Sequence, residues 1–242
     1  MALVALGRLT DGWTPLQRHP SAPLGAVRRS NSPPHRSARV AGQDHRGRAS
    51  GSVSGTARPF LTDRCTPDCK DELVRIDPDP AGSEFGLLSQ YLDYQRETML
   101  SKTDGLTREQ LARKHPPSEL TLAGLLYHLS LVEEDWMEVR FAALPDREPW
   151  ANVDWDSDPN WEFRTAADLE PEQLQGRYRK ACERSRQVMS KAANLDQLSV
   201  KALRDGRHFS LRWVLLHLVE ETARHAGHAD FLREAIDGTV GE

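Results

Sequence analysis

The sequence predicts an all-α protein in which four long helices form a bundle behind an N-terminal tail. Four segments repeat apolar residues at every third or fourth position, which is the period of an α-helix, and no segment alternates convincingly as a strand would. Residues 1–70 show neither period and are crowded with Pro, Gly, Ser and Arg. A chain of 242 residues with 38% hydrophobic content suits one domain, placed at residues 71–242, better than two.

Charge separates the tail from the rest of the chain. Residues 1–70 hold 11 Lys and Arg against 4 Asp and Glu, whereas residues 71–242 hold 21 against 32. This composition, without periodicity, predicts a disordered basic tail. Two other interpretations fit the same stretch: translation starts downstream of Met1, or the Arg-rich and Ser-rich segment is an organellar transit peptide.

Composition also argues against several kinds of partner. An acidic helical domain disfavours nucleic acid, because Lys and Arg that neutralise phosphates supply most of such affinity. No apolar run approaches the roughly 18 residues that indicate a membrane span. The three cysteines, Cys65, Cys69 and Cys182, are too few for a disulfide framework. We therefore expect a cytoplasmic protein that binds neither nucleic acid nor membrane.

The first two helices have recognisable start and stop signals. The first is predicted within residues 83–106, where apolar residues recur at helical spacing and Gly105 supplies a stop. The second follows a Pro-Pro pair within residues 116–144, with Thr121 as its capping residue. Its apolar stripe consists of Leu125, Leu129, Val132, Trp136 and Val139.

The last two helices follow the same logic. The third is predicted within residues 170–192, because Pro171 suits the first helical position and apolar residues then recur on a largely polar background. The fourth lies within residues 205–238, capped by Ser210 and closed by Gly238. An apolar remainder on the third helix leads us to expect a homodimer, since small bundles often use such a surface for a symmetric contact.

A long connection separates the second helix from the third. It reads "PDREPWANVDWDSDPNWEF" at residues 145–163 and holds three of the six tryptophans, Trp150, Trp155 and Trp161. Long loops in small domains are often functional, so these residues are candidates for a lid. The alternative is that the tryptophans pin the loop to the bundle by ordinary packing.

The fourth helix carries polar residues on its apolar face. With Glu221 at zero and about 100° per residue, His225 falls at about 40° and the apolar Val214 near 20°. His217 falls at about −40° and His228 at about −20° by the same geometry. Helical residues four apart can meet, so Glu221 and His225 can point at one atom. A buried carboxylate is costly unless a cation or hydrogen bonds satisfy it, and a metal ion would serve both residues.

The second helix offers a third ligand. His128 lies within about 60° of the apolar stripe and therefore borders the predicted core. Three ligands from two helices, with coordination positions left open, are typical of a catalytic metal site. A single histidine beside a core stripe is more often an ordinary buried residue, so the prediction depends on the set.

These residues resemble the DinB-like four-helix superfamily, and within it the mycothiol transferase branch. The similarity lies in "GLLYHL" and the downstream "RWVLLHLVEETARHAGHADFLRE", and it spans roughly residues 83–240. In that superfamily a histidine of the second helix and a His/Glu-x-x-x-His pair of the fourth bind a divalent metal, commonly zinc or nickel. Carried over, the ligands are His128, Glu221 and His225. The glutamate resembles the mycothiol-dependent maleylpyruvate isomerase variant, and His217 and His228 are candidates for orienting the ligands.

The resemblance implies a divalent-metal-dependent thiol transferase. Its cofactor would be zinc or nickel, and its co-substrate a low-molecular-weight thiol similar to mycothiol. The metal would hold this thiol as the thiolate, which is the nucleophilic form. The acceptor would be a small electrophile, as in detoxification, and the resemblance assigns no further catalytic residue.

Two alternatives stay open from the residues alone. In the first, the chain is a non-catalytic, stress-related metal-binding or interaction protein, in which the same residues form a structural cluster. In the second, it is a hydrolase that uses a metal-bound hydroxide. An open coordination position separates a catalytic site from a closed structural one.

Overall fold

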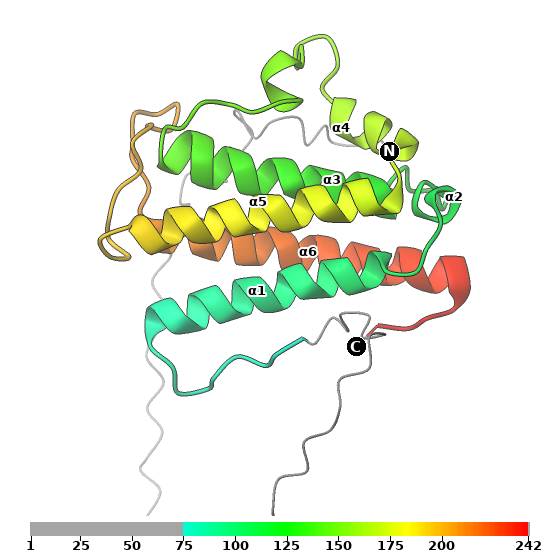
Figure 1. Cartoon of the computed structure of the whole chain (residues 1–242), viewed down its shortest axis with the longest axis horizontal. Helices are drawn as coiled ribbons and strands as arrows, with labels where there is room; N and C mark the ends of the chain where they lie inside the picture. Colours follow the sequence, from blue (N-terminus) through cyan, green and yellow to red (C-terminus); the bar gives the residue numbers. More distant parts are fainter. Residues whose placement is uncertain (1–74, 242) are drawn as a thin grey trace, which may run out of the picture. The chain divides into compact units, whose positions relative to one another are not determined.

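The computed structural model describes residues 75–241, and the predicted tail at residues 1–70 lies outside these described residues. Four long helices dominate the described part (Figure 1): α1 (Glu84–Thr103), α3 (Leu122–Glu133), α5 (Pro171–Lys191) and α6 (Leu211–Asp237). Residues 75–241 contain no strand, and only one isolated bridge joins Leu198 to Ser210. The prediction of an all-α bundle is confirmed.

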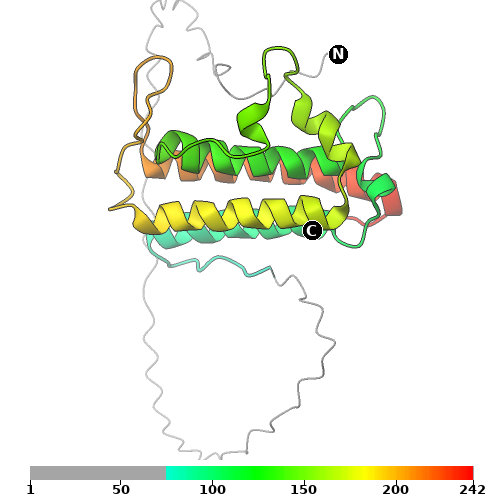
Figure 2. The same cartoon turned by 45° about the horizontal axis from the view of Figure 1, so that its top comes forward.

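The direction of the helices explains the long connection. Helices α1 and α6 run one way, whereas α3 and α5 run the other way (Figures 1 and 2). Helix α1 packs chiefly on α6, and α3 packs chiefly on α5. Because α3 and α5 are parallel, the chain must return along the bundle between them, as in bundles with long crossover connections. The connection predicted at residues 145–163 is part of this crossover.

Short helices interrupt the connections. Helix α2 (Arg108–Leu111) lies between α1 and α3. The crossover contains η2 (Trp150–Asn152), α4 (Trp161–Thr165) and η3 (Ala166–Asp168). Of these, α4 packs against α3, which brings the crossover onto the bundle beside the second long helix.

The start and stop signals lie where the sequence predicts them. The Thr121 side chain accepts a hydrogen bond from the Gly124 N–H at the start of α3, and Ser210 does the same for the first turn of α6. Pro171 is the first residue of α5. Helix α6 ends at Gly238, whose φ of 79° places it in the left-handed region that glycine adopts without strain.

Helix α3 is buried beyond the apolar stripe that the sequence predicts. All 12 of its residues are buried, not only those of the apolar stripe, because α1, α4, α5 and α6 all pack against it. The helix continues as a π-helix, η1 (Glu134–Phe141), in which Val139 is only partly buried. The acidic residues of η1 are paired: Arg184 of α5 lies 2.6 Å from both Glu134 and Glu138.

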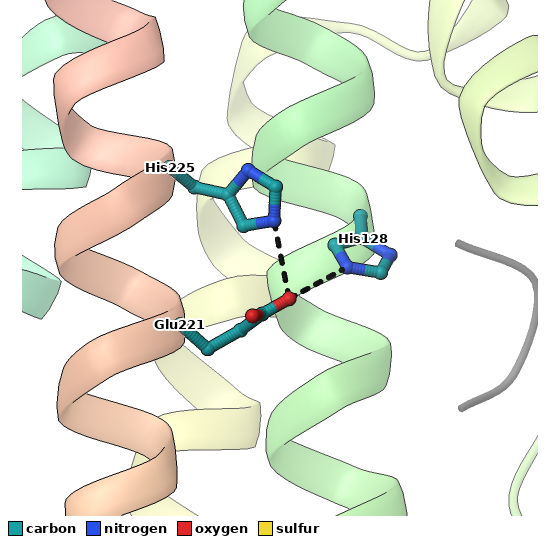
Figure 3. Close-up of side chains that lie close together, drawn as sticks. All are labelled: His128, Glu221 and His225. Carbon is teal, nitrogen blue, oxygen red and sulfur yellow. Dashed lines mark hydrogen bonds and ion pairs between the residues drawn. The ribbon is translucent and has the colours of Figure 1, made fainter. Parts of the chain in front are cut away.

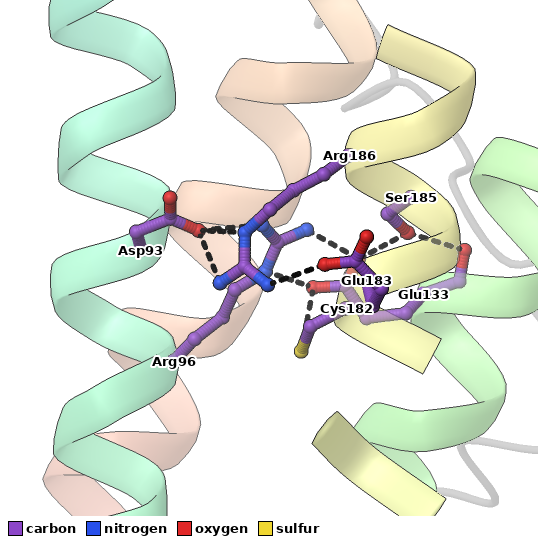
Figure 4. A network of polar contacts seen from close by, with 7 residues as sticks. All are labelled: Asp93, Arg96, Glu133, Cys182, Glu183, Ser185 and Arg186. Atoms are coloured by element: carbon purple, nitrogen blue, oxygen red, sulfur yellow. Dashed lines mark hydrogen bonds and ion pairs between the residues drawn. The ribbon is translucent and has the colours of Figure 1, made fainter. Parts of the chain in front are cut away.

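A polar network crosses the core between α1, α3 and α5 (Figure 4). Arg96 donates to both carboxylate oxygens of Glu133, at 2.7 and 2.6 Å, and both side chains are 1% exposed. The Ser185 hydroxyl donates to Glu133 at 2.6 Å. Burial opposes the charge on Arg96, but Glu133 outweighs this and raises the pKa of the guanidinium.

The apolar residues of α5 do not form the exposed surface that the sequence suggested for a homodimer. The apolar residues of α5, such as Leu174, Tyr178 and Cys182, are buried inside the bundle. Large exposed apolar side chains lie instead on α1 and α6: Phe85, Tyr91, Trp213, Leu216 and Phe231. The homodimer stays a prediction. No helix within residues 75–241 is long and apolar enough to cross a membrane.

Candidate metal centre

Three predicted ligands from two helices meet in the core. His128 of α3 faces Glu221 and His225 of α6, and one ligand atom from each lies within 4.8 Å of the other two (Figure 3). The Nε2 atom of His225 is 3.2 Å from Glu221 Oε1, and the Nε2 atom of His128 is 3.6 Å from the same oxygen. All three residues are nearly inaccessible, with exposed fractions of 2%, 2% and 1%.

The second nitrogen of His128 contacts a residue that sequence reasoning missed. Glu162 of α4 is fully buried, and its Oε1 lies 3.3 Å from His128 Nδ1. The ring of Phe163, the next residue, stacks on the His128 ring with centroids 5.1 Å apart. One feature of the sequence could have identified Glu162: it lies between two aromatic residues, Trp161 and Phe163. Aromatic neighbours favour burial of the segment, and a carboxylate in a buried segment needs a partner.

The two other histidines of α6 differ in position. The Nδ1 atom of His228 lies 3.4 Å from Nδ1 of His225, so His228 can orient that ring. His217 instead packs between Trp136 and Trp213, with ring centroids 4.5 and 5.3 Å away. Within the described residues, no hydrogen bond joins His217 to the three predicted ligands. Burial lowers the pKa of His217 and of His228, which favours their neutral forms.

Electrostatics in the cluster favour an ionised Glu221. Burial alone would raise the pKa of this carboxyl group, but the close contacts with His128 and His225 outweigh it and bring the pKa well below its usual range. For His128, burial opposes the charged form, yet contacts with Glu162 and Glu221 raise its pKa. The contacts with the two imidazoles thus stabilise the ionised form of Glu221 within the buried cluster.

The three tryptophans of the crossover form one aromatic cluster. Trp150 is buried against Tyr127, with ring centroids 4.7 Å apart, and Trp161 lies 5.9 Å from Trp150. Trp155 is partly buried and lies 6.4 Å from Trp161. These contacts match the packing alternative for the tryptophans, and a lid role stays a prediction.

The residues fit a divalent metal ion. Two imidazole nitrogens and one carboxylate oxygen are the donor set of many catalytic zinc sites. The Nε2 atom of His128 is buried and has no hydrogen-bond partner, although it points toward Glu221. A buried polar atom without a partner is costly, and a cation between these donors would satisfy it. The positions of the three residues on α3 and α6 and the chemistry of their donor atoms therefore both fit a divalent metal ion.

The fold and the cluster define a DinB-like helical bundle with a His-Glu-His cluster between its second and last long helices. The family model described as mycothiol-S-transferase matches residues 87–238. The chain therefore belongs to the mycothiol-S-transferase family. No curated protein sequence matches it.

Three solved structures resemble this chain at low sequence identity. A conserved protein from Enterococcus faecalis is 16% identical with a TM-score of 0.51, over 66% of this chain and 100% of that chain. A protein from Clostridium difficile 630 is 12% identical with a TM-score of 0.49, over 64% and 99%. The mycothiol-dependent maleylpyruvate isomerase is 12% identical with a TM-score of 0.45, over 60% of each chain. The likeness to the Enterococcus faecalis protein supports a shared fold and says nothing about function.

Proposed function

We propose that this protein is a divalent-metal-dependent transferase that joins a low-molecular-weight thiol, similar to mycothiol, to a small electrophile. Membership of the mycothiol-S-transferase family supports the thiol and the reaction type. The single observation that carries the metal dependence is the convergence of three buried donor atoms from α3 and α6 within 4.8 Å.

The residues of the chain have distinct tasks in this proposal. His128 and His225 offer neutral nitrogen donors, and Glu221 offers a carboxylate that the cluster keeps ionised. The packed helices around them exclude water, which strengthens electrostatic interactions with a bound thiolate. When bound, the metal lowers the pKa of a coordinating thiol so that it is deprotonated at neutral pH. Three protein ligands leave a position for that thiol.

The described part of the chain offers no nucleophilic thiol of its own. Its one cysteine, Cys182, is buried, and burial together with nearby Glu133 raises the pKa of the thiol far above its usual range. A thiol that stays protonated is a poor nucleophile. Within the described residues, the reacting sulfur would therefore have to come from a co-substrate.

The first test is metal content and thiol transfer in wild-type protein purified without affinity metal. We expect about one zinc or nickel ion per chain, and thiol-dependent loss of an electrophile such as monochlorobimane. The variants His128→Ala and His225→Ala should lose both, because a three-ligand site that lacks one ligand holds its ion weakly. His208→Ala is the control, since this histidine bonds the Ser199 carbonyl in the α5–α6 connection.

Three results would count against the proposal. Negligible metal in the wild type and both variants would favour a polar cluster without an ion. Bound metal without any turnover would favour the non-catalytic alternative. Turnover of an ester substrate that needs metal but no added thiol would favour the hydrolase.

A further inference from the structure

We propose that Glu162 of α4 is a positioning residue of the metal centre, which holds the His128 ring so that its Nε2 atom faces Glu221 and His225. The inference rests on the proposed function, because it assigns a role toward the same metal. It adds a residue from the crossover to a site otherwise built from α3 and α6.

The geometry gives the two ring nitrogens of His128 different partners. Nδ1 lies 3.3 Å from Glu162 Oε1, and Nε2 lies 3.6 Å from Glu221 Oε1. A neutral imidazole carries one N–H group, and a carboxylate can only accept a hydrogen bond. If Nδ1 carries the hydrogen and donates it to Glu162, the lone pair of Nε2 is free for the metal. Hydrogen bonds of this kind fix the tautomer and orientation of metal-binding histidines.

The burial of Glu162 is hard to explain by stability alone. The residue is 0% exposed, and its Oε2 atom has no hydrogen-bond partner. Burying a carboxylate with an unsatisfied oxygen costs free energy that a leucine of similar size would not cost. Functional sites are where such costs are commonly retained.

A glycine on α3 makes room for this arrangement. Gly124 lies one turn before His128, and a Cβ atom at that position would lie 2.9 Å from Cδ1 of Phe163. Real Cβ contacts are longer, so a side chain there would push against the Phe163 ring, and it would also lie 3.0 Å from Thr121 Oγ1. The absence of a side chain at Gly124 therefore lets α4 lie close to α3, with Phe163 stacked on the His128 ring.

The experiment compares zinc affinity in four proteins: wild type, Glu162→Leu, Glu162→Gln and Asp168→Asn. Affinity is measured on chelator-stripped protein by competition with a chromophoric zinc chelator. We expect Glu162→Leu to weaken zinc binding by about 10-fold to 100-fold, as is typical when such an orienting partner is lost. Glu162→Gln should lose less, because its amide oxygen still accepts from Nδ1. Asp168→Asn removes an exposed charge from the same crossover and should bind zinc as wild type does.

A second measurement separates positioning from a structural role. Long-range ¹⁵N–¹H correlation spectra of the metal-free protein, recorded at a pH where the ring is neutral, identify the protonated nitrogen of His128. We expect Nδ1–H in the wild type. In Glu162→Leu we expect the hydrogen to move to Nε2, because Glu221 is then the remaining acceptor.

The zinc affinities and the His128 tautomer either support or overturn the positioning role of Glu162. Unchanged zinc affinity in Glu162→Leu, or an Nε2–H tautomer in wild-type protein, overturns the proposal. A lower melting temperature with unchanged affinity and tautomer also overturns it, since that pattern is purely structural. If wild-type protein binds no zinc, the proposed function fails, and the tautomer measurement still decides the role of Glu162.

Discussion

Arg96 and Glu133 illustrate how single buried residues shape this bundle. Their side chains form two hydrogen bonds in the core, and Ser185 completes the surroundings of the carboxylate. A buried pair of this kind contributes little net stability compared with apolar residues, but breaking it leaves one charge without a partner. The same reasoning applies to Glu162, whose buried charge we connect with His128.

We predict that Arg96→Met destabilises the protein by about 3–5 kcal/mol, because Glu133 would remain buried without its cation. Urea unfolding followed by circular dichroism measures the change. Arg207→Met is the control, since its pair with Asp205 is exposed and such pairs contribute about 1 kcal/mol or less. The double variant with Glu133→Leu should recover much of the loss. A loss in Arg96→Met no larger than in the control would contradict this account.

The crossover is the element that links the bundle to the proposed site. It must return along the bundle because α3 and α5 are parallel, and on this path α4 packs against α3 beside His128. Its aromatic residues pack on the core through Trp150 and Trp161. A segment that could have been a simple linker thus contributes the side chains that surround one predicted ligand.

We predict that Gly124→Ala lowers zinc affinity without reducing helix content. Alanine favours a helix over glycine, but here its Cβ would lie 2.9 Å from Cδ1 of Phe163, and we expect the strain to disturb the packing of α4 on α3 beside His128. Zinc competition and circular dichroism measure the two effects. The matched control is Gly176→Ala on α5, where nothing lies within 4 Å of an added Cβ. This variant should gain about 0.5–1 kcal/mol and bind zinc normally. Equal zinc affinity in both variants would refute the prediction.

At the scale of the whole molecule, the family match at residues 87–238 lies within the described residues 75–241. The composition of residues 1–70 sets them apart from this helical part by charge and by lack of periodicity. We therefore propose that residues 71–242 form the folded domain, and that a tail of this composition adds little to its stability.

We predict that a chain starting at Asp71 keeps the helical circular dichroism and the melting temperature of the full-length protein. The measurement is a thermal melt of both proteins at equal concentration. Metal content of the two preparations provides an independent check on the site. Failure of the shortened chain to fold in solution would show that the first 70 residues contribute to the domain.

The sequence alone determined the four long helices, their capping residues and the set His128, Glu221 and His225. Helical periodicity, caps and the four-residue spacing of Glu221 and His225 are local features that can be read along one segment, whereas His128 joined the set through its place beside the apolar stripe and through the family resemblance. The family resemblance is confirmed by the match to the mycothiol-S-transferase model, whereas metal binding by the three residues stays a prediction.

Only the tertiary structure decided which residues surround this set. Glu162 is 34 positions from His128, and Glu133 is 37 positions from Arg96, so no local pattern pairs them. The complete burial of α3 likewise depends on four other helices, α4 among them, and not on its own period. Periodicity shows which side of a helix is apolar, but the partners of a buried charge follow from how distant segments pack, because burial removes water as the alternative partner.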